Sequence, residues 1–189
     1  YALALDTKRQ GRQLYTPSTI LSDVPMEFGS DNLYIPANFN NQFNGPVRFR
    51  ISLASSLNIP AVALLNTLGV ENYLDKLYEL GFDSLKNGGL EADLGLALGA
   101  GEVSLKELTT AFSVFVRDGK DFNNNQIYSV DTARLICSIL SDVSARALGF
   151  GYTQTFQTDY PSIFKTGTAN QYQKINCNCY FRSFSCCWK

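Results

Sequence analysis

The sequence predicts one folded domain that is rich in helices and has a strand close to its C-terminal end. The chain has 189 residues, of which 45% are hydrophobic and 17% charged, and this balance is typical of a globular domain with its own core. Apolar residues recur at helical spacing in several segments, and Gly or Pro stands where these segments begin or end. The segment Ser162–Thr168 has strand character instead.

Three features organise the first third of the chain. Thr16–Leu21, with Pro in its first turn, resembles a capped helical turn. Residues 23–46 are rich in Asn, Gly, Pro and aromatic residues, so we expect a long ordered loop there. Gly45-Pro46 then opens a helix that ends near Ser55-Ser56 and whose apolar members are Val47, Ile51, Leu53 and Ala54.

The next helices have clear start and stop signals. Pro60 starts a helix that Gly69 stops. An amphipathic helix follows over Glu71–Leu80, because its apolar residues fall on one face, and Gly81 ends it. Residues 86–101 are Gly-rich and predict mostly loop.

Two further helices follow in the second half of the chain. Ser104 and Glu107 form a capping box, in which each side chain accepts from an N–H group that the helix leaves unpaired, and this helix ends before Gly119. Residues 121–126 predict a polar, Asn-rich turn. The last helix covers about Val130–Leu140.

Charge and residue content exclude several classes of function. The net charge of −1 gives no strong general affinity for nucleic acid or for an anionic membrane. The chain has no His, which excludes any Ser-His-Asp or Cys-His arrangement within it. No apolar run reaches the length of about 18 residues that a transmembrane helix needs, and no signal peptide is visible. We interpret the apolar start Tyr1–Leu5 as the middle of a helix, and we expect the natural protein to continue upstream.

The five Cys residues are unevenly placed. Cys137 lies in an apolar helical pattern and predicts a packed thiol. The other four crowd into the last stretch: Cys177, Cys179, Cys186 and Cys187. Their C-x-C…C-C spacing is not a usual zinc pattern, so we predict no metal and no cofactor, and disulfides remain open if the chain is exported. Periodicity disappears after Gln173, so we divide the chain into a domain over 1–173 and an atypical Cys-rich tail over 174–189, either a terminal extension or a frame-disrupted end.

Two short motifs offer groups for chemistry. Ser56-Leu57-Asn58 lies where one predicted helix ends and the next begins, and residues two apart in an extended loop point to the same side. This motif would present a hydroxyl and an amide to one cleft, although both residues are also common helix caps. In the second motif, Lys165-Thr166-Gly167-Thr168, strand alternation places Lys165 and Gly167 on one face, and Gly often marks close approach of a ligand. An edge strand with a protective Lys is the alternative.

The order and spacing of these motifs resemble the transpeptidase domain of class A penicillin-binding proteins, especially the 1C type. That family combines S-x-x-K, an S-x-N triplet and K-T-G. The resemblance covers about residues 1–172 and extends to five segments: Ile20–Pro25, Tyr34–Phe39, Ser56–Val62, Leu96–Gly99 with Glu102–Ser104, and Phe164–Thr168. It implies an α+β fold, with a helical subdomain packed on an antiparallel sheet that is incomplete at both ends, and the site at their junction.

The resemblance also implies a mechanism, D,D-transpeptidation of peptidoglycan stem peptides that end in D-Ala-D-Ala. A serine attacks the D-Ala-D-Ala carbonyl, and the resulting acyl group passes to an amine. Ser56 would relay a proton to the leaving group, Asn58 would bind the acyl-donor amide, and Lys165 would attract the substrate carboxylate. The substrate-binding residues would be Thr166, Gly167 and Thr168, and the Thr168 N–H would form half of the oxyanion hole. Partners would be stem peptides and β-lactams, not nucleic acid. The parent protein would be anchored upstream in the cytoplasmic membrane and face the periplasm or outer surface.

The sequence departs from this family at the nucleophile. Its one S-x-x-K match is Ser162-Ile163-Phe164-Lys165, which we reject because residues three apart face opposite sides of a strand. The family would place the true motif a few residues before Tyr1. We therefore expect this chain alone to be inactive. The alternatives are a non-catalytic binding or scaffold module that keeps the cleft, and a β-lactamase-like hydrolase or penicillin sensor.

Overall fold

Helices are the main regular elements of the described chain, and two small antiparallel sheets accompany them, so the predicted α+β class is confirmed. The computed structural model describes residues 1–29, 33–87, 93–152, 159–160 and 162–167. In chain order the elements are α1 (Ala2–Asp6), β1 (Lys8–Arg9), β2 (Arg12–Gln13), β3 (Ile20–Asp23), β4 (Gly45–Arg48), α2 (Phe49–Ala54), α3 (Asn58–Leu68), α4 (Val70–Glu79), α5 (Ser84–Asn87), the 3₁₀ helix η1 (Leu94–Leu98), α6 (Leu105–Val116), α7 (Val130–Ser141) and α8 (Ala147–Phe150).

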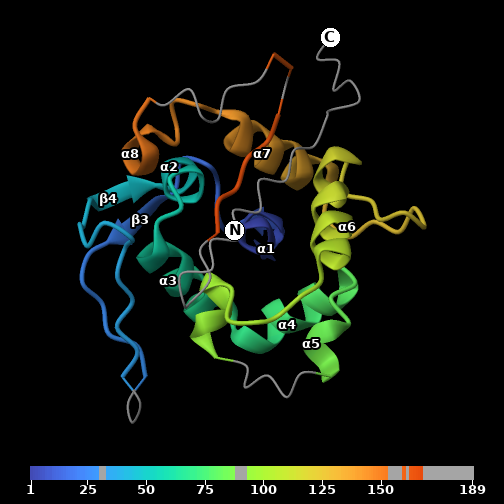
Figure 1. Cartoon of the computed structure of the whole chain (residues 1–189), viewed down its shortest axis with the longest axis horizontal. Helices are drawn as coiled ribbons and strands as arrows, with labels where there is room; N and C mark the ends of the chain where they lie inside the picture. Colours follow the sequence, from blue (N-terminus) through green and yellow to red (C-terminus); the bar gives the residue numbers. More distant parts are fainter. Residues whose placement is uncertain (30–32, 88–92, 153–158, 161, 168–189) are drawn as a thin grey trace.

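The short helix α1 lies at the centre of the molecule, with the other helices around it (Figure 1). Its Ala4 and Leu5 are completely buried and belong to the main hydrophobic core, together with Phe49 of α2 and Ile139 of α7. The Tyr1 ring meets Phe49 edge-on, with 5.0 Å between ring centroids. Burying a side chain such as Leu5 or Phe49 contributes about 1.5–3 kcal/mol, so this core determines where α2 and α7 lie.

Hydrogen bonds also hold α1 and α2 against the two ends of α7. Asp6 Oδ1, at the end of α1, accepts hydrogen bonds from the Ser129 N–H at 3.0 Å and from the Thr132 hydroxyl at 2.9 Å, both at the start of α7. Arg50 of α2 donates through Nε to Asp142 Oδ2 at 2.9 Å, just beyond the end of α7. α7 is therefore held at both of its ends.

The helices predicted from Gly stops and caps are confirmed. The helix predicted from Pro60 begins two residues earlier, at Asn58, and ends at Leu68 before Gly69. α4 and α7 occupy the segments expected of them. α6 begins with the expected capping box, because the Ser104 hydroxyl accepts from the Glu107 N–H and the Glu107 carboxylate accepts from the Ser104 N–H.

Other expected features are also present. Asp121 Oδ1 accepts from the N–H groups of Asn123 and Asn125, each at 2.8 Å, which builds the polar turn expected at 121–126. Residues 86–101 are not only loop, because the last residues of α5 and the whole of η1 lie among the described part of this segment.

Parts of two segments predicted to be helical are strands instead, and for these parts the prediction was wrong. They are the end of the predicted turn, from Ile20, and the start of the predicted helix, Gly45–Arg48, whereas Phe49–Ala54 is helical as expected. β3 begins at Ile20 and pairs antiparallel with β4, with Leu21 opposite Val47. Gly45 has a φ of 70°, which a right-handed helix does not contain, so the helix begins only at Phe49. Burial alternates along β3, but the apolar Ile20 is 59% exposed and the charged Asp23 is completely buried, so the sequence does not show the apolar–polar alternation that reveals a strand.

The predicted strand over Ser162–Thr168 is also corrected for the part that the structure describes. Residues 162–167 pair with no strand among the described residues, and the Phe164 N–H instead donates to the Leu140 carbonyl of α7 at 3.1 Å. A regular strand needs a neighbour to hydrogen-bond with, and a helix end takes that place here.

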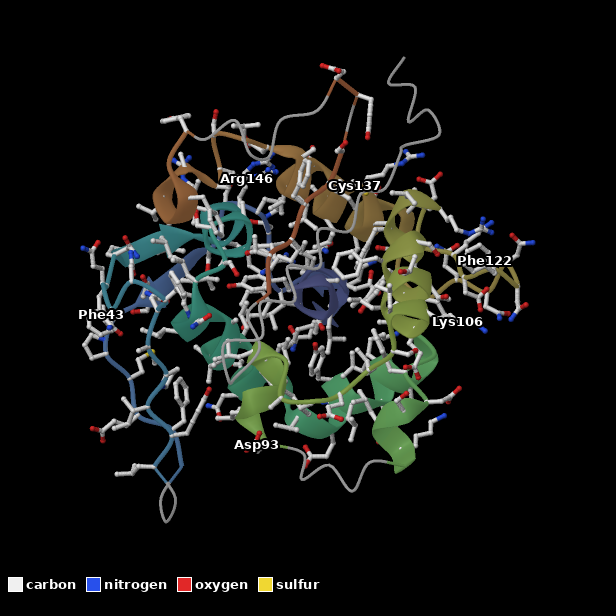
Figure 2. The ribbon with its side chains drawn as sticks, in the orientation of Figure 1. Phe43, Asp93, Lys106, Phe122, Cys137 and Arg146 are labelled. Atoms are coloured by element: carbon white, nitrogen blue, oxygen red, sulfur yellow. The ribbon has the colours of Figure 1, made fainter. Side chains whose placement is uncertain are left out.

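The predictions about the cysteines are tested only at Cys137. Cys137 is packed against the core, as predicted, and its thiol donates to the Phe115 carbonyl at 3.4 Å. Cys177, Cys179, Cys186 and Cys187 lie outside the described residues. Figure 2 shows Phe43 and Phe122 at opposite edges of the molecule, and they are 47% and 62% exposed. In the described part of the chain, every helix is too short or too polar to cross a bilayer.

Candidate functional site

The Ser56-Leu57-Asn58 loop joins α2 to α3 and has an unusual backbone. Ser56 has a φ of 56°, in the left-handed region that residues other than Gly seldom adopt. This conformation costs about 1–2 kcal/mol, so the surrounding structure must impose it. Asn58, in the first turn of α3, donates through Nδ2 to the Ala37 carbonyl at 2.7 Å, and its N–H donates to Asn38 Oδ1 at 2.9 Å.

Lys165 approaches this loop from the other end of the sequence. Its Nζ donates to Ser56 Oγ at 2.6 Å and to the Thr166 carbonyl at 2.7 Å, although 109 residues separate Lys165 from Ser56. No carboxylate among the described residues pairs with this ammonium group. Burial lowers the pKa of Lys165 from 10.5 to about 8, because desolvation penalises the charged form.

The segment that carries Lys165 is held against the helical body. Ile163 belongs to the main core, and Phe164 is buried. The Arg146 guanidinium lies 5.1 Å from the Phe164 ring centroid, and Arg146 also donates to the Leu140 carbonyl at 2.5 Å. The same Leu140 carbonyl accepts from the Phe164 N–H, so the C-terminal end of α7 positions the segment just before Lys165.

The segment that leads into α8 also contacts the Ser56 loop, through Ser55. The buried Ser55 hydroxyl donates to the Ala145 carbonyl at 3.0 Å. α8 approaches the same residue so closely that a Cβ added to Gly149 would stand 2.4 Å from the Ser55 carbonyl oxygen. Only a glycine fits at 149 without a shift, and this close contact lies next to Ser56.

The structure brings some of the predicted site residues together and leaves others apart. Ser56 and Lys165 are in direct contact, and Asn58 lies two residues from Ser56. Thr166 is half-buried, whereas Gly167 is exposed and has no described atom within 4 Å of the place where a Cβ would stand. Thr168 lies outside the described residues.

Sequence reasoning gave no role to Asn38, Ser55 or Gly149. Asn38 lies in the family-like segment Tyr34–Phe39, but an Asn in a loop does not by itself indicate a structural role. Gly149 could be recognised only once α8 was seen to touch the Ser55 carbonyl.

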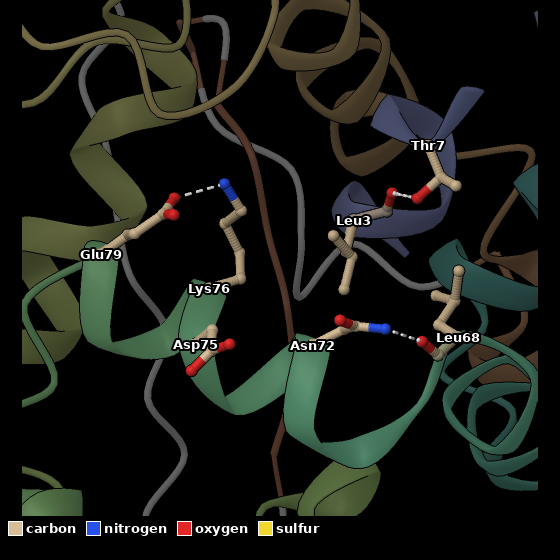
Figure 3. A pocket seen from close by; sticks show the side chains of 7 residues that line it. All are labelled: Leu3, Thr7, Leu68, Asn72, Asp75, Lys76 and Glu79. Carbon is tan, nitrogen blue, oxygen red and sulfur yellow. Dashed lines mark hydrogen bonds and ion pairs between the residues drawn. The ribbon is translucent and has the colours of Figure 1, made fainter. Parts of the chain in front are cut away.

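A separate cavity of about 380 Å³ lies between α1 and α4, and neither Ser56 nor Lys165 lines it (Figure 3). Its lining includes the Lys76–Glu79 ion pair and Asn72, whose side chain donates to the Leu68 carbonyl at 2.7 Å. No cluster of three or more Asp, Glu, Cys or His side chains among the described residues could hold a metal ion. The chemistry that the described site can offer is therefore a hydroxyl, an amide and a cation.

Solved structures of penicillin-binding proteins share this fold. Penicillin-binding protein 1A from Haemophilus influenzae aligns with a TM-score of 0.72 over 90% of this chain and 33% of that chain, at 22% identity. PonA1 from Mycobacterium tuberculosis aligns with a TM-score of 0.65 over 87% of this chain and 50% of that chain, at 15% identity. A peptidoglycan glycosyltransferase from Burkholderia ambifaria aligns with a TM-score of 0.66 over 90% of this chain and 60% of that chain, at 21% identity. The fold is that of penicillin-binding proteins.

Sequence comparison finds relatives among the penicillin-binding proteins 1C and 1A. Penicillin-binding protein 1C of Escherichia coli K12 is 35% identical over 120 residues, which are 64% of this chain and 14% of the relative. Penicillin-binding protein 1A of Pseudomonas aeruginosa is 29% identical over 135 residues, 70% of this chain and 15% of the relative. No protein-family model matches the chain. The chain is thus homologous, over part of its length, to class A penicillin-binding proteins, and it spans about one seventh of these relatives.

Proposed function

We propose that residues 1–173 are a partial D,D-transpeptidase domain that acts in peptidoglycan cross-linking. The observation that supports this most directly is the 2.6 Å contact between Lys165 Nζ and Ser56 Oγ. A hydroxyl beside a desolvated cation without a carboxylate partner offers both a proton relay and a place for a carboxylate. The homology to class A penicillin-binding proteins supports a part in peptidoglycan synthesis in general. Within this proposal the substrates are stem peptides with a free terminal carboxylate.

In this proposal each residue has a distinct part. The Lys165 ammonium attracts the substrate carboxylate, with Thr166 and Thr168 as hydrogen-bond donors, while Asn58 binds the acyl-donor amide. An upstream serine attacks the D-Ala-D-Ala carbonyl, the bond to the terminal D-Ala breaks, and Ser56 passes a proton to the departing amine. A second amine then takes the acyl group and frees the serine.

The same proposal includes a location and partners. The parent protein is anchored in the cytoplasmic membrane and works on its periplasmic or outer face, where peptidoglycan peptides and β-lactams reach it. The homology to class A penicillin-binding proteins is the support for these proposed properties, and the chain spans about one seventh of those relatives.

One observation favours a second function, a non-catalytic module that binds cell-wall peptides. The only S-x-x-K sequence in the chain ends at Lys165, and its Ser162 is buried and donates to the Tyr160 carbonyl at 3.1 Å. A serine held in this way is not available as a nucleophile. The two functions share the Ser56–Lys165 site and differ in whether an in-frame Ser-x-x-Lys precedes Tyr1 in the natural coding sequence.

Ligand binding tests the Ser56–Lys165 site that both functions share. N-acetyl-D-alanyl-D-alanine titrated into the chain should shift NMR signals around Ser56 and Lys165, and Lys165→Met should weaken binding at least tenfold by removing the cation. Lys106→Met is the matched control, because Lys106 is exposed on α6 (Figure 2) and should leave the affinity unchanged. An equal affinity of wild type and Lys165→Met for this peptide would contradict the proposal.

Labelled penicillin separates the enzyme from the binding module. The 189-residue chain should give no covalent band on a gel, because acylation needs the serine of an S-x-x-K helix. A longer chain that contains such an upstream motif should give a stable band. A stable band on the 189-residue chain would show that we have misassigned the nucleophile.

A further inference from the structure

Helix α3 begins without a cap of its own. Leu57 stands at the N-cap position, and no side chain there accepts a hydrogen bond from the first turn. The N–H groups of a first turn have no partner within their helix, so another group must accept from them. Asn38, from the loop between β3 and β4, supplies that acceptor, because its Oδ1 accepts from the Asn58 N–H at 2.9 Å.

Asn38 is itself held in one orientation by a buried carboxylate. Asn38 is 4% exposed and Asp23 is completely buried. Asn38 Nδ2 donates to the two carboxylate oxygens of Asp23 at 2.8 and 3.0 Å, and to the Gln42 carbonyl at 2.8 Å. An ionised carboxylate only accepts hydrogen bonds, so the NH₂ group must face Asp23 and the Oδ1 atom must face α3.

Asp23 is anchored in turn at the end of β3. Its Oδ2 atom accepts from the main-chain N–H of Asn44 at 3.0 Å and from the Asn44 side chain at 2.6 Å. A buried carboxylate with this many N–H donors is expensive to disturb, which makes it a rigid support. The support stays in place because β3 pairs with β4 on either side of the loop.

The loop also holds the side chain that the proposed function needs. Asn58 Nδ2 donates to the Ala37 carbonyl, so neighbouring loop residues fix both the main chain and the side chain of Asn58. Figure 1 shows this part of the loop beside α3. Ser56, two residues before Asn58, keeps its left-handed backbone and accepts from Lys165.

We infer that Asn38 is a positioning residue, anchored by Asp23, that orients Asn58 and the Ser56 loop toward Lys165. This inference rests on the proposed function for its purpose, but the contacts themselves can be tested without a ligand. Asn38 does not touch the substrate in this role. It acts through Asn58.

Amide hydrogen exchange measured by NMR tests the contact directly. Asn38→Ala should speed exchange of the Asn58 N–H at least tenfold beyond any change in α7, because that N–H loses its acceptor. Gln42→Ala, with an exposed side chain, controls for change on the loop surface. Unchanged protection of the Asn58 N–H in Asn38→Ala would overturn the inference.

A second variant covers the case in which Asn38→Ala does not fold. Asn38→Asp keeps the size of the side chain but replaces the NH₂ group that donates to Asp23 with an oxygen, so two carboxyl groups would meet at this place. Their repulsion should move the side chain away from α3 and speed exchange of the Asn58 N–H at least tenfold beyond any change in α7. Protection of the Asn58 N–H equal to that of wild type would overturn the role of Asn38.

Two ligands distinguish positioning from general stability. D-alanine offers a carboxylate for Lys165, whereas N-acetyl-D-alanyl-D-alanine adds the amides that Asn58 would bind. Asn38→Ala should weaken the dipeptide at least tenfold and D-alanine less than twofold. An equal loss for both ligands would show a merely structural role and overturn the inference. If wild type binds neither ligand, the proposed function fails, and the exchange experiment still decides whether Asn38 positions Asn58.

Discussion

Lys165 should make the chain less stable at neutral pH than a variant without this charge. Its pKa is lowered from 10.5 to about 8 by burial, so the folded state binds the proton more weakly than the unfolded state does. At about 1.4 kcal/mol per pKa unit, the charged Lys165 lowers the free energy of unfolding by at most about 3 kcal/mol. Lys165→Met gains this stability by removing the charge, but it also loses the hydrogen bonds to Ser56 and Thr166, and this loss offsets about 1 kcal/mol of the gain.

The direction of the pH dependence follows from proton binding. Between pH 8 and 10.5 the unfolded chain keeps the Lys165 proton and the folded chain loses it, so the free energy of unfolding rises with pH in wild type. Lys165→Met lacks this rise. The variant should therefore be more stable than wild type by about 2 kcal/mol at pH 7, and this advantage should shrink as the pH increases above 8.

Urea unfolding followed by circular dichroism, at pH values from 6 to 9.5 and constant ionic strength, measures the difference. Burial raises the pKa of the Tyr1 and Tyr128 phenols, but both proteins contain them, so their contribution cancels in the comparison. Lys106→Met, at an exposed position, should keep the pH profile of wild type. A stability difference between Lys165→Met and wild type that stays constant from pH 6 to 9.5 would refute a desolvated Lys165.

Two further predictions concern the support of the site and of its helices. Gly149→Ala should destabilise the chain by about 1–3 kcal/mol in urea unfolding, because the new Cβ would meet the Ser55 carbonyl. Leu148→Ala, in the same turn but exposed, should change stability by less than about 0.5 kcal/mol, and similar losses for both would argue against the contact. Ser104→Ala should cost about 0.5–2 kcal/mol and lower the protection of the first-turn amides of α6, and unchanged exchange there would contradict the cap.

The helices could be predicted from the sequence because their signals are local. Gly69 has a φ of 88° and ends α3, and Ser104 with Glu107 starts α6 through contacts three residues apart. The strands β3 and β4 could not be predicted in the same way. Each has four residues, and their pairing depends on a partner about 25 residues away rather than on a local pattern.

The candidate site was only partly visible in the sequence. The motif residues Ser56 and Lys165 could be named by resemblance, but no rule of spacing predicts contact between residues 109 positions apart. The role of Asn38 could not be predicted, because it depends on the Asp23 carboxylate on one side and the start of α3 on the other. Such a role is set by tertiary contacts, and the sequence shows only an Asn in a polar loop.

The long separation between Ser56 and Lys165 has a consequence for synthesis of the chain. At about 5–20 residues per second, a ribosome needs about 5–20 s to add the residues between them. The core helices and the Asn38 contact can form during that interval, since all of their residues precede Lys165. A nascent or prematurely terminated chain would therefore have the hydroxyl and the amide in place, with no cation to draw a carboxylate toward them.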